Sequence, residues 1–177
     1  MARVFRASAL CALFASAGTA IATAQDHVLV CGYFSSNVIS FDPDTYAFET
    51  ELLGPAVGVG FPYAATLSGN RLVLCDWGSN AVVEFDAVSG SFVNGITNSG
   101  APGGSDLPAG VAFGPDGLLY VSSSRENVVR RYDTATATPL GVFAPASTGL
   151  SEPDALLWTG AGQLLVCSRA NHSVFRF

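Results

Sequence analysis

Residues 107–121 read Leu-Pro-Ala-Gly-Val-Ala-Phe-Gly-Pro-Asp-Gly-Leu-Leu-Tyr-Val, and this stretch shows the local pattern of the chain most clearly. It contains two short apolar runs separated by the turn pair Asp116-Gly117. Glycine and asparagine tolerate the positive φ angles that tight hairpin turns need. The runs are short and lack apolar residues at the helical spacing i, i+3, i+4, i+7. The stretch therefore predicts two antiparallel strands joined by a tight turn.

The same pattern recurs along the chain. Apolar runs follow Pro62, Pro108 and Pro153, and they end at the turn pairs Gly69-Asn70, Asp116-Gly117 and Ala161-Gly162. A second kind of run carries a small residue at its third position: Leu29-Val30-Cys31, Val73-Leu74-Cys75, Tyr120-Val121-Ser122 and Leu165-Val166-Cys167. Ten residues after each small residue comes an aromatic residue, namely Phe41, Phe85, Tyr132 and Phe177. The unit is a repeat of about 45 residues.

Each repeat contains room for four short strands separated by turns and polar loops. That period and that strand number are typical of one blade of a β-propeller. The sequence therefore predicts an all-β fold, a β-propeller built of four-stranded antiparallel blades. A β-sandwich and a β-solenoid are the alternatives.

The stretch 107–121 resembles the core of an NHL-type propeller repeat, and residues 125–133 (Arg-Glu-Asn-Val-Val-Arg-Arg-Tyr-Asp) match its second half. The pattern is similar to that of streptogramin lyases, of the gluconolactonase/regucalcin group and of surface-layer-type propellers. The resemblance covers nearly the whole chain after its first 24 residues. It implies the propeller fold and leaves the function open, because such propellers include lyases, lactonases and pure binding modules.

The repeats give about 3.5 blades, at approximately 25–53, 54–97, 98–143 and 144–177. We expect the first to begin at its second strand and the last to end at its third, Phe177. The propellers that this repeat resembles mostly have six or seven blades, and an open arc of fewer blades would expose strand edges. Three interpretations follow: a fragment of a longer protein, two chains that associate to complete one ring, or a compact small propeller.

The pattern of the first 24 residues predicts a signal peptide. Arg3 and Arg6 give a positive start, residues 7–22 are uncharged and rich in alanine, and Ala22-Thr23-Ala24 forms a cleavage site. We expect export to the periplasm or the extracellular space. No apolar run is long enough for a membrane span.

The composition excludes two classes of protein. Of the 177 residues 49% are hydrophobic and 12% charged, with fourteen acids against eight arginines and a net charge of −6. A chain this apolar is not intrinsically disordered. A lysine-free acidic chain is not suited to the phosphates of a nucleic acid, so we expect no nucleic-acid partner.

The three cysteines after the signal share one column of the repeat with Ser122: Cys31, Cys75 and Cys167. The column favours a small residue, and buried cysteine behaves as a small hydrophobe. Equivalent positions in adjacent blades lie too far apart for a disulfide, so we expect free buried thiols. The acids after the aromatic residues, such as Asp42, Asp86 and Asp133, are expected to bond their own turns.

Alternating strand direction places the loops after the second and fourth strands of each repeat on one face of the ring. Loops on a rigid scaffold often carry function, so this face is the predicted surface for a protein, an envelope component or a small ligand. An alternative role for Tyr33 and Trp77 is to cap the neighbouring blade. The predicted binding residues are Tyr33, Phe34, Tyr63, Trp77, Arg125, Glu126, Arg169 and His172.

The resemblance to gluconolactonase-like propellers implies an alternative with a divalent cation such as Ca²⁺ on the axis, bound partly by residues that follow the opening proline. The matching positions are Tyr63, Ala109 and Asp154. Only Asp154 is able to bind a metal, with Glu152 as a second oxygen donor, so we expect no cofactor and keep these two residues as the candidate metal site.

Catalysis is poorly supported by the residue pattern. A reaction like that of streptogramin lyases needs histidine and glutamate, and the only histidines are His27 and His172. Motifs for a serine nucleophile and for phosphate binding are missing. We therefore predict a binding or scaffold module. The alternative is a lactonase- or lyase-like propeller enzyme, or a non-functional fragment of one.

Overall fold

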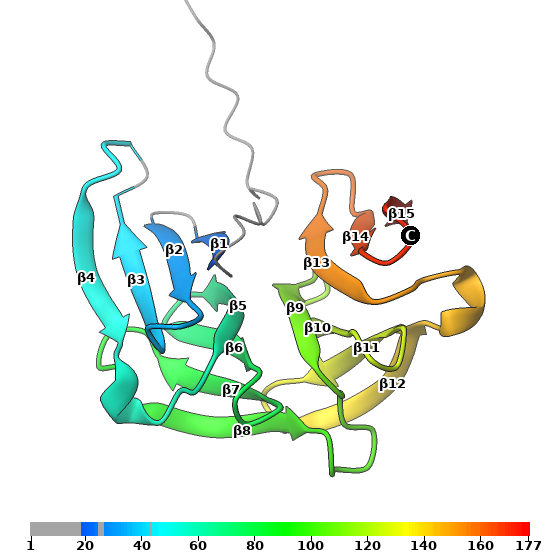
Figure 1. Ribbon diagram of the computed structural model, residues 1–177, viewed down its shortest axis with the longest axis horizontal. Helices are drawn as coiled ribbons and strands as arrows, with labels where there is room; N and C mark the ends of the chain where they lie inside the picture. Colours follow the sequence, from blue (N-terminus) through cyan, green and yellow to red (C-terminus); the bar gives the residue numbers. More distant parts are fainter. Residues whose placement is uncertain (1–18, 25–26, 43) are drawn as a thin grey trace, which may run out of the picture.

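The computed structural model describes residues 19–24, 27–42 and 44–177, which form four antiparallel β-sheets. Figure 1 shows the sheets placed around a common centre in chain order, with β1, β5, β9 and β13 on the inner side. Within each sheet the strands follow one another outward from that centre. This arrangement confirms the predicted β-propeller of about 3.5 blades.

The first blade consists of β1 (Thr19–Ala24), β2 (His27–Gly32), β3 (Asn37–Phe41) and β4 (Phe48–Leu53). The second consists of β5 (Pro62–Ser68), β6 (Arg71–Asp76), β7 (Ala81–Asp86) and β8 (Phe92–Asn98). The third consists of β9 (Pro108–Phe113), β10 (Leu119–Ser123), β11 (Val128–Asp133) and β12 (Thr138–Ala144). The fourth has β13 (Pro153–Trp158), β14 (Leu164–Ser168) and β15 (Ser173–Arg176). Two 3₁₀ turns, Pro55–Val57 and Ala146–Thr148, precede β5 and β13.

The repeated apolar runs form the second strand of each blade, and their alternation builds the core. In β6, Leu72 and Leu74 pack toward the first blade, while Val73 and Cys75 pack toward the third. Successive side chains of a strand point to opposite faces of the sheet. A strand with a neighbouring sheet on each side is therefore apolar at every position, which explains the continuous runs seen in the sequence.

The first blade differs from the prediction in one strand. The sequence led us to expect a first repeat without an innermost strand, but β1 pairs antiparallel with β2, from Thr19 opposite Gly32 to Ala24 opposite His27. The expectation of a three-stranded first blade is therefore wrong for the full chain, whereas a chain cleaved before Gln25 would have the three strands that the sequence led us to expect. Strand β1 lies within the predicted signal peptide, whose removal remains a prediction.

Aspartates after the third strand close the outer turns, as predicted. The Asp86 carboxylate accepts hydrogen bonds from the backbone N–H groups of Val88 and Ser89 at 3.0 and 2.7 Å. These bonds, the Ser89 bond first, lower the pKa of Asp86. Asp42 and Asp133 form the same kind of turn in their blades.

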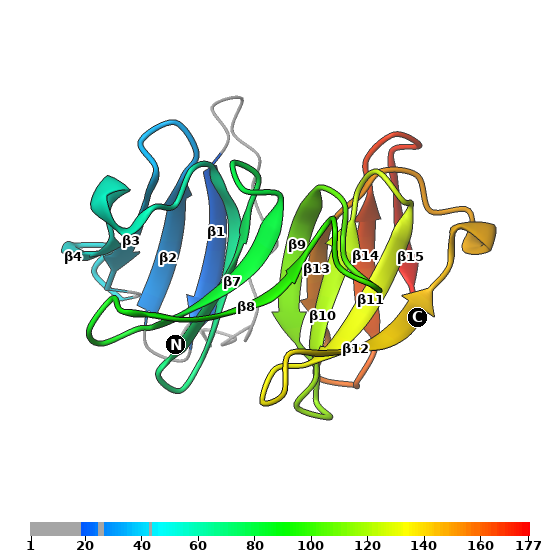
Figure 2. The ribbon, with the colours of Figure 1, turned by 90° about the horizontal axis from the view of Figure 1, so that it is seen from below.

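The blades twist from their inner to their outer strands. In Figure 2 the outermost strands β8 and β12 run obliquely to the inner strands β1 and β9. This is the usual right-handed twist of β-sheets, which lets adjacent blades pack face to face around a ring. No helix among the described residues has the length and apolar character needed to cross a membrane.

Two of the three predicted thiols are deeply buried. Cys31 and Cys75 are inaccessible to solvent, and Cys167 is half-buried. Burial raises the pKa of Cys31 to about 12 and that of Cys75 well above its usual value. No disulfide joins these three cysteines, as the sequence analysis predicted.

Candidate functional site

The loops that follow the second and fourth strands lie against one another at one end of the blades, as strand alternation predicts. Backbone bonds join them in three blades: Trp77 N–H to the Phe61 carbonyl, Arg125 N–H to the Asp106 carbonyl, and Arg169 N–H to the Glu152 carbonyl. We call this end the loop face. It consists of residues 33–36, 54–61, 77–80, 99–107, 124–127, 145–152 and 169–172.

Asparagines of the repeat fix the loop face by bridging adjacent blades. Asn80 of the second blade accepts the backbone N–H of Leu107 at 2.7 Å and donates to the Asp106 carboxylate at 2.9 Å. Asn127 of the third blade accepts the N–H of Glu152 at 2.7 Å. Leu107 and Glu152 both have a φ of 49°, which L-residues adopt rarely. The asparagine bonds thus hold a backbone conformation that would otherwise be unfavourable.

A buried carboxylate holds the loop face of the second blade. Asp76 ends β6, is 3% exposed, and accepts the backbone N–H groups of Phe61 at 2.8 Å and Gly60 at 3.2 Å. Ser123 and Ser168 occupy the equivalent positions in the third and fourth blades and bond the corresponding loops there. One column of the repeat therefore anchors the segments that precede β5, β9 and β13.

Five aromatic side chains of the first two blades gather at the loop face, four from its loops and Tyr63 from the adjoining start of β5. The rings of Tyr63 and Trp77 stack in parallel with centroids 4.2 Å apart, and Tyr33 meets both edge-on at 6.2 and 6.1 Å. Phe34 and Phe61 each lie 5.0 Å from Tyr33 and are 78% and 42% exposed. We call these five residues the aromatic cluster.

Trp77 also carries the capping role considered in the sequence analysis. Its indole Nε1–H donates to the Pro108 carbonyl of the third blade at 2.8 Å. The ring therefore joins two blades and forms part of the aromatic cluster at the same time. The two roles fall to different members of the aromatic cluster. Trp77 caps the neighbouring blade, whereas Phe34 faces solvent.

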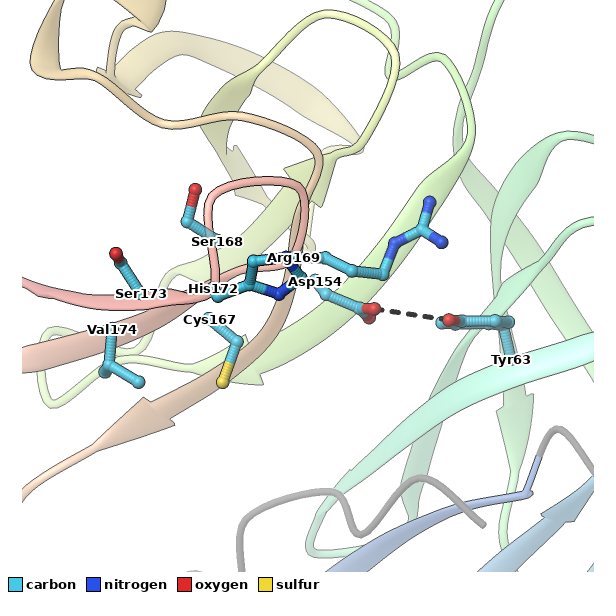
Figure 3. Close-up of a pocket in the computed structure, with 8 residues that line it drawn as sticks. All are labelled: Tyr63, Asp154, Cys167, Ser168, Arg169, His172, Ser173 and Val174. Atoms are coloured by element: carbon cyan, nitrogen blue, oxygen red, sulfur yellow. Dashed lines mark hydrogen bonds between the residues drawn. The ribbon is translucent and has the colours of Figure 1, made fainter. Parts of the chain in front are cut away.

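Tyr63 of the second blade and Asp154 of the fourth meet across the centre of the ring, although the third blade lies between theirs. Both follow the opening proline of an innermost strand, and the Tyr63 hydroxyl donates to Asp154 Oδ2 at 3.2 Å (Figure 3). The equivalent residue between them is Ala109, which leaves room for the tyrosine. The next residue, Gly110, has no space for a Cβ against the Asp154 carbonyl, so β9 and β13 approach closely here.

Burial controls the ionisation of this pair. Asp154 is 3% exposed, and its burial raises its pKa to about 6 against the opposing effects of the Tyr63 hydrogen bond and the Arg169 charge. Burial likewise raises the pKa of Tyr63, with a further contribution from the charge of Asp154. A carboxyl group with this pKa exchanges its proton near neutral pH.

A pocket of about 470 Å³ opens beside Asp154. Its wall combines Tyr63 and Asp154 with the end of β14, the start of β15 and the loop between them (Figure 3). Arg169 lies at the pocket and pairs with Glu152 at 2.7 Å, and His172 is exposed. The lining residues are Tyr63, Asp154, Cys167, Ser168, Arg169, His172, Ser173 and Val174.

The other predicted charges, Arg125 and Glu126, lie on the loop face of the third blade, away from these pocket residues. Arg125 pairs with Asp106 at 3.3 Å, and Glu126 pairs with Arg130 at 2.7 Å. Burial acts to raise the pKa of Glu126, but the hydrogen bonds from Arg130 and Ser123 outweigh it and lower the pKa. Both charges are thus held in ion pairs that stiffen the loop.

The two candidate metal ligands have different partners. Asp154 faces Tyr63, whereas Glu152 pairs with Arg169. The described part of the chain has no group of three or more histidine, cysteine, aspartate or glutamate side chains placed to hold a metal ion. A cation at Asp154 and Glu152 would have to compete with these contacts, and it stays a prediction.

The sequence prediction brought together residues that the structure divides into three places. Tyr33, Phe34, Tyr63 and Trp77 form one cluster, and Arg169 and His172 join Asp154 at the pocket, which Tyr63 also lines. Arg125 and Glu126 stand apart from both. Sequence reasoning missed the anchoring role of Asp76. The signal was present, because Asp76 directly follows the cysteine column and Ser123 and Ser168 occupy the same place.

Comparison with known proteins identifies the fold. No family model matches the chain, and no curated protein matches it. Among solved structures, a streptogramin B lyase aligns with a TM-score of 0.62 at 15% identity, over 91% of this chain and 51% of the lyase chain. The hydrazine synthase of Kuenenia stuttgartiensis aligns with a TM-score of 0.60 at 16% identity, over 85% and 45%. The chain is a partial β-propeller.

A third similar structure is of comparable size. The computationally designed Ika4 protein aligns with a TM-score of 0.56 at 12% identity, covering 88% of this propeller and 86% of the designed chain. Against the lyase and the hydrazine synthase, the propeller spans about half of the matched chain. Identities this low establish the architecture alone.

Proposed function

We propose that this propeller is a binding module that takes up its partner on the aromatic cluster of the loop face. The observation that carries the proposal is the exposure of Phe34 and Phe61 on a packed platform of Tyr33, Tyr63 and Trp77. Exposed aromatic rings on a rigid support offer a large contact area at a small cost in side-chain entropy. Rings held in this way suit a partner with a ring-shaped or apolar group.

The surroundings of the cluster favour binding over catalysis. Its loops are held by Asp76 and by bonds between blades, so the platform is organised before a partner arrives. The polar groups beside it are engaged: Asp154 with Tyr63, and Glu152 with Arg169. The partner is a protein, an envelope component or a small ligand, as the sequence indicated.

A binding measurement with two probes tests this proposal. The probes are N-acetyl-tryptophanamide, for a protein side chain, and the disaccharide of N-acetylglucosamine, for envelope material. Binding is followed by saturation-transfer NMR on the purified protein. The double variant Phe34→Ser, Phe61→Ser is compared with the control Tyr46→Ser, because Tyr46 is 73% exposed and lies in the β3–β4 turn at the opposite end of its blade.

We expect at least one probe to bind the protein and the control equally, and its affinity to fall about tenfold or more in the double variant. The probe that binds separates a protein side chain from an envelope sugar. Binding that is unchanged in the double variant, or the failure of both probes, would overturn the proposal. Thermal melting of both variants checks that the fold is intact.

A lactonase- or lyase-type enzyme is the second candidate, and one observation favours it. The Asp154 carboxyl lies at the pocket with a pKa of about 6, near Arg169 and His172. Such a group is suited to proton transfer near neutral pH. Turnover of a chromogenic lactone that disappears in Asp154→Asn would support this function. A rise in melting temperature with CaCl₂ that is also lost in Asp154→Asn would support the cation site.

We also propose that the protein is exported. The support is the N-terminal pattern of Arg3, Arg6 and the apolar run before Ala24. Expression in a bacterial host, followed by mass spectrometry of the periplasmic fraction, tests it. A mature chain that starts at Gln25 is the expected result, and an uncleaved cytoplasmic chain would contradict it.

A further inference from the structure

Adjacent blades of this propeller pack by one repeated rule. The second and third strands of a blade present one apolar side to the next blade and the other to the preceding blade. We call these the leading side and the trailing side. Between the first two blades, the leading side contributes Leu29, Cys31 and Val38, and the trailing side contributes Leu72, Leu74 and Phe85. The same columns meet between the second and third blades, as Val73, Cys75 and Val82 against Leu119, Val121 and Tyr132.

The leading side of the fourth blade is uncovered. Val38, Val82 and Val129 occupy one column in the first three blades, and each is 0% exposed. The fourth member of that column, Val174, is 63% exposed. Cys167 is half-buried, whereas its equivalents Cys31 and Cys75 are inaccessible. Identical or similar residues thus differ in exposure only where the next blade is lacking.

The trailing side of the first blade is uncovered in the matching way. Val28, Val30 and Phe41 are all half-buried. Their equivalents in the second blade, Leu72, Leu74 and Phe85, are 0%, 0% and 2% exposed. The two ends of the arc therefore present the two complementary sides that meet at every internal junction.

These two sides do not meet within one chain. Figure 1 shows the first and fourth blades at the two ends of the arc, with a gap between their inner strands β1 and β13. The pocket of about 470 Å³ borders Cys167 and Val174 and so lies next to the uncovered leading side. Proteins rarely leave such apolar sides exposed.

We propose that a second copy of this chain covers both ends, with the fourth blade of each copy packed on the first blade of the other to close a two-chain ring. The interface continues the packing already present between blades, so it needs no new kind of contact. The size fits as well: one chain spans 51% of the streptogramin B lyase chain, so two copies supply about one propeller of that length. The contact joins unlike surfaces and closes by two-fold rotation.

Substitutions that introduce a charge at each end test the interface. Val174→Arg blocks the leading side of the fourth blade, and Val30→Arg blocks the trailing side of the first. Val88→Arg is the matched control, because Val88 is 80% exposed in the β7–β8 turn. Light scattering coupled to size exclusion measures the mass of each purified protein. We expect the unmodified chain and the control to have twice the mass of one chain, and each end variant to have the mass of one.

Mixing the two end variants gives the decisive measurement. The Val174→Arg chain keeps an intact first blade, and the Val30→Arg chain keeps an intact fourth blade, so one intact junction forms between them. A mixed dimer is therefore expected although each variant alone is monomeric, and its formation also shows that both variants are folded. A monomeric unmodified chain, or a dimer that survives Val174→Arg, would overturn the proposal. Neither result bears on the aromatic cluster, which is tested separately.

Discussion

Removal of the buried carboxylate of Asp76 is expected to destabilise the propeller strongly. Two loops depend on this group, one before β5 and one after β6. It accepts the backbone N–H groups of Gly60, Phe61, Gly78 and Ser79 at 3.2, 2.8, 3.1 and 3.3 Å, and the Ser79 hydroxyl at 2.6 Å. Asp76→Ala leaves all of these donors without their acceptor.

The magnitude follows from the number of donors and from their access to water. A hydrogen bond to a charged group contributes about 1.5–3 kcal/mol, and a buried donor left without a partner costs about 1–3 kcal/mol. Residues 61, 78 and 79 are themselves exposed, so water is able to replace part of the lost bonding. We therefore expect a loss of about 3–4 kcal/mol of unfolding free energy, a large share of the 5–15 kcal/mol that a typical domain has.

Urea unfolding of three variants measures this effect. Asp86→Ala is the control, because the Asp86 carboxylate also bonds a turn but does so at the surface, where water replaces it readily. Asp76→Ser introduces the residue found at the equivalent positions 123 and 168, where the serine hydroxyls bond the corresponding loops. It should retain part of the stability. The reasoning is refuted if Asp76→Ala costs no more than Asp86→Ala.

Four further predictions concern a buried carboxyl group, two ion pairs and the first strand. Because burial raises the pKa of Asp154 to about 6, the folded state binds more protons than the unfolded state between pH 4 and 6. The unfolding free energy should fall by up to about 3 kcal/mol as pH rises through this window, and Asp154→Asn should abolish that dependence in urea titrations. Arg71→Met leaves Glu84, 3% exposed, without its ion pair, and should cost about 3 kcal/mol in urea unfolding. Arg125→Met breaks an exposed pair and should cost under about 1 kcal/mol. A chain that begins at Gln25 lacks β1, and its melting temperature should lie several degrees below that of a chain that retains this strand; equal values would show that β1 contributes nothing.

The architecture could be predicted because the repeat constrains every level of the structure. The runs that lead to Cys75 and Ser122 carry apolar residues on both faces, since each face is covered by a neighbouring blade. Turn pairs such as Asp116-Gly117 fall at a constant distance from these runs. Period, strand length and turn chemistry all agree, so one fold satisfies them.

The site was predicted less completely, because its contacts cross the ring. Tyr63 and Asp154 are 91 residues apart in sequence, and nothing local indicates that their side chains meet. Their contact depends on Ala109 between them and on the close approach of β9 and β13 at Gly110. Tyr63, Ala109 and Asp154 share one column of the repeat, but the repeat alone indicates at most a shared ligand position and not a contact between the first and the last of them.

The repeat also explains where function is to be sought. Residues that agree with their column, such as Val38, Val82 and Val129, are buried and serve the packing of the blades. Residues that depart from it mark the unusual places: Tyr63 and Asp154 stand where the third blade has Ala109, and both follow directly after loops of the loop face. Val174 is a valine like the other members of its column, but it is exposed because no blade of this chain packs against it. A residue whose type differs from the rest of its column therefore points to a ligand of the loop face. A residue of the usual type that is exposed where its equivalents are buried points to a second propeller chain.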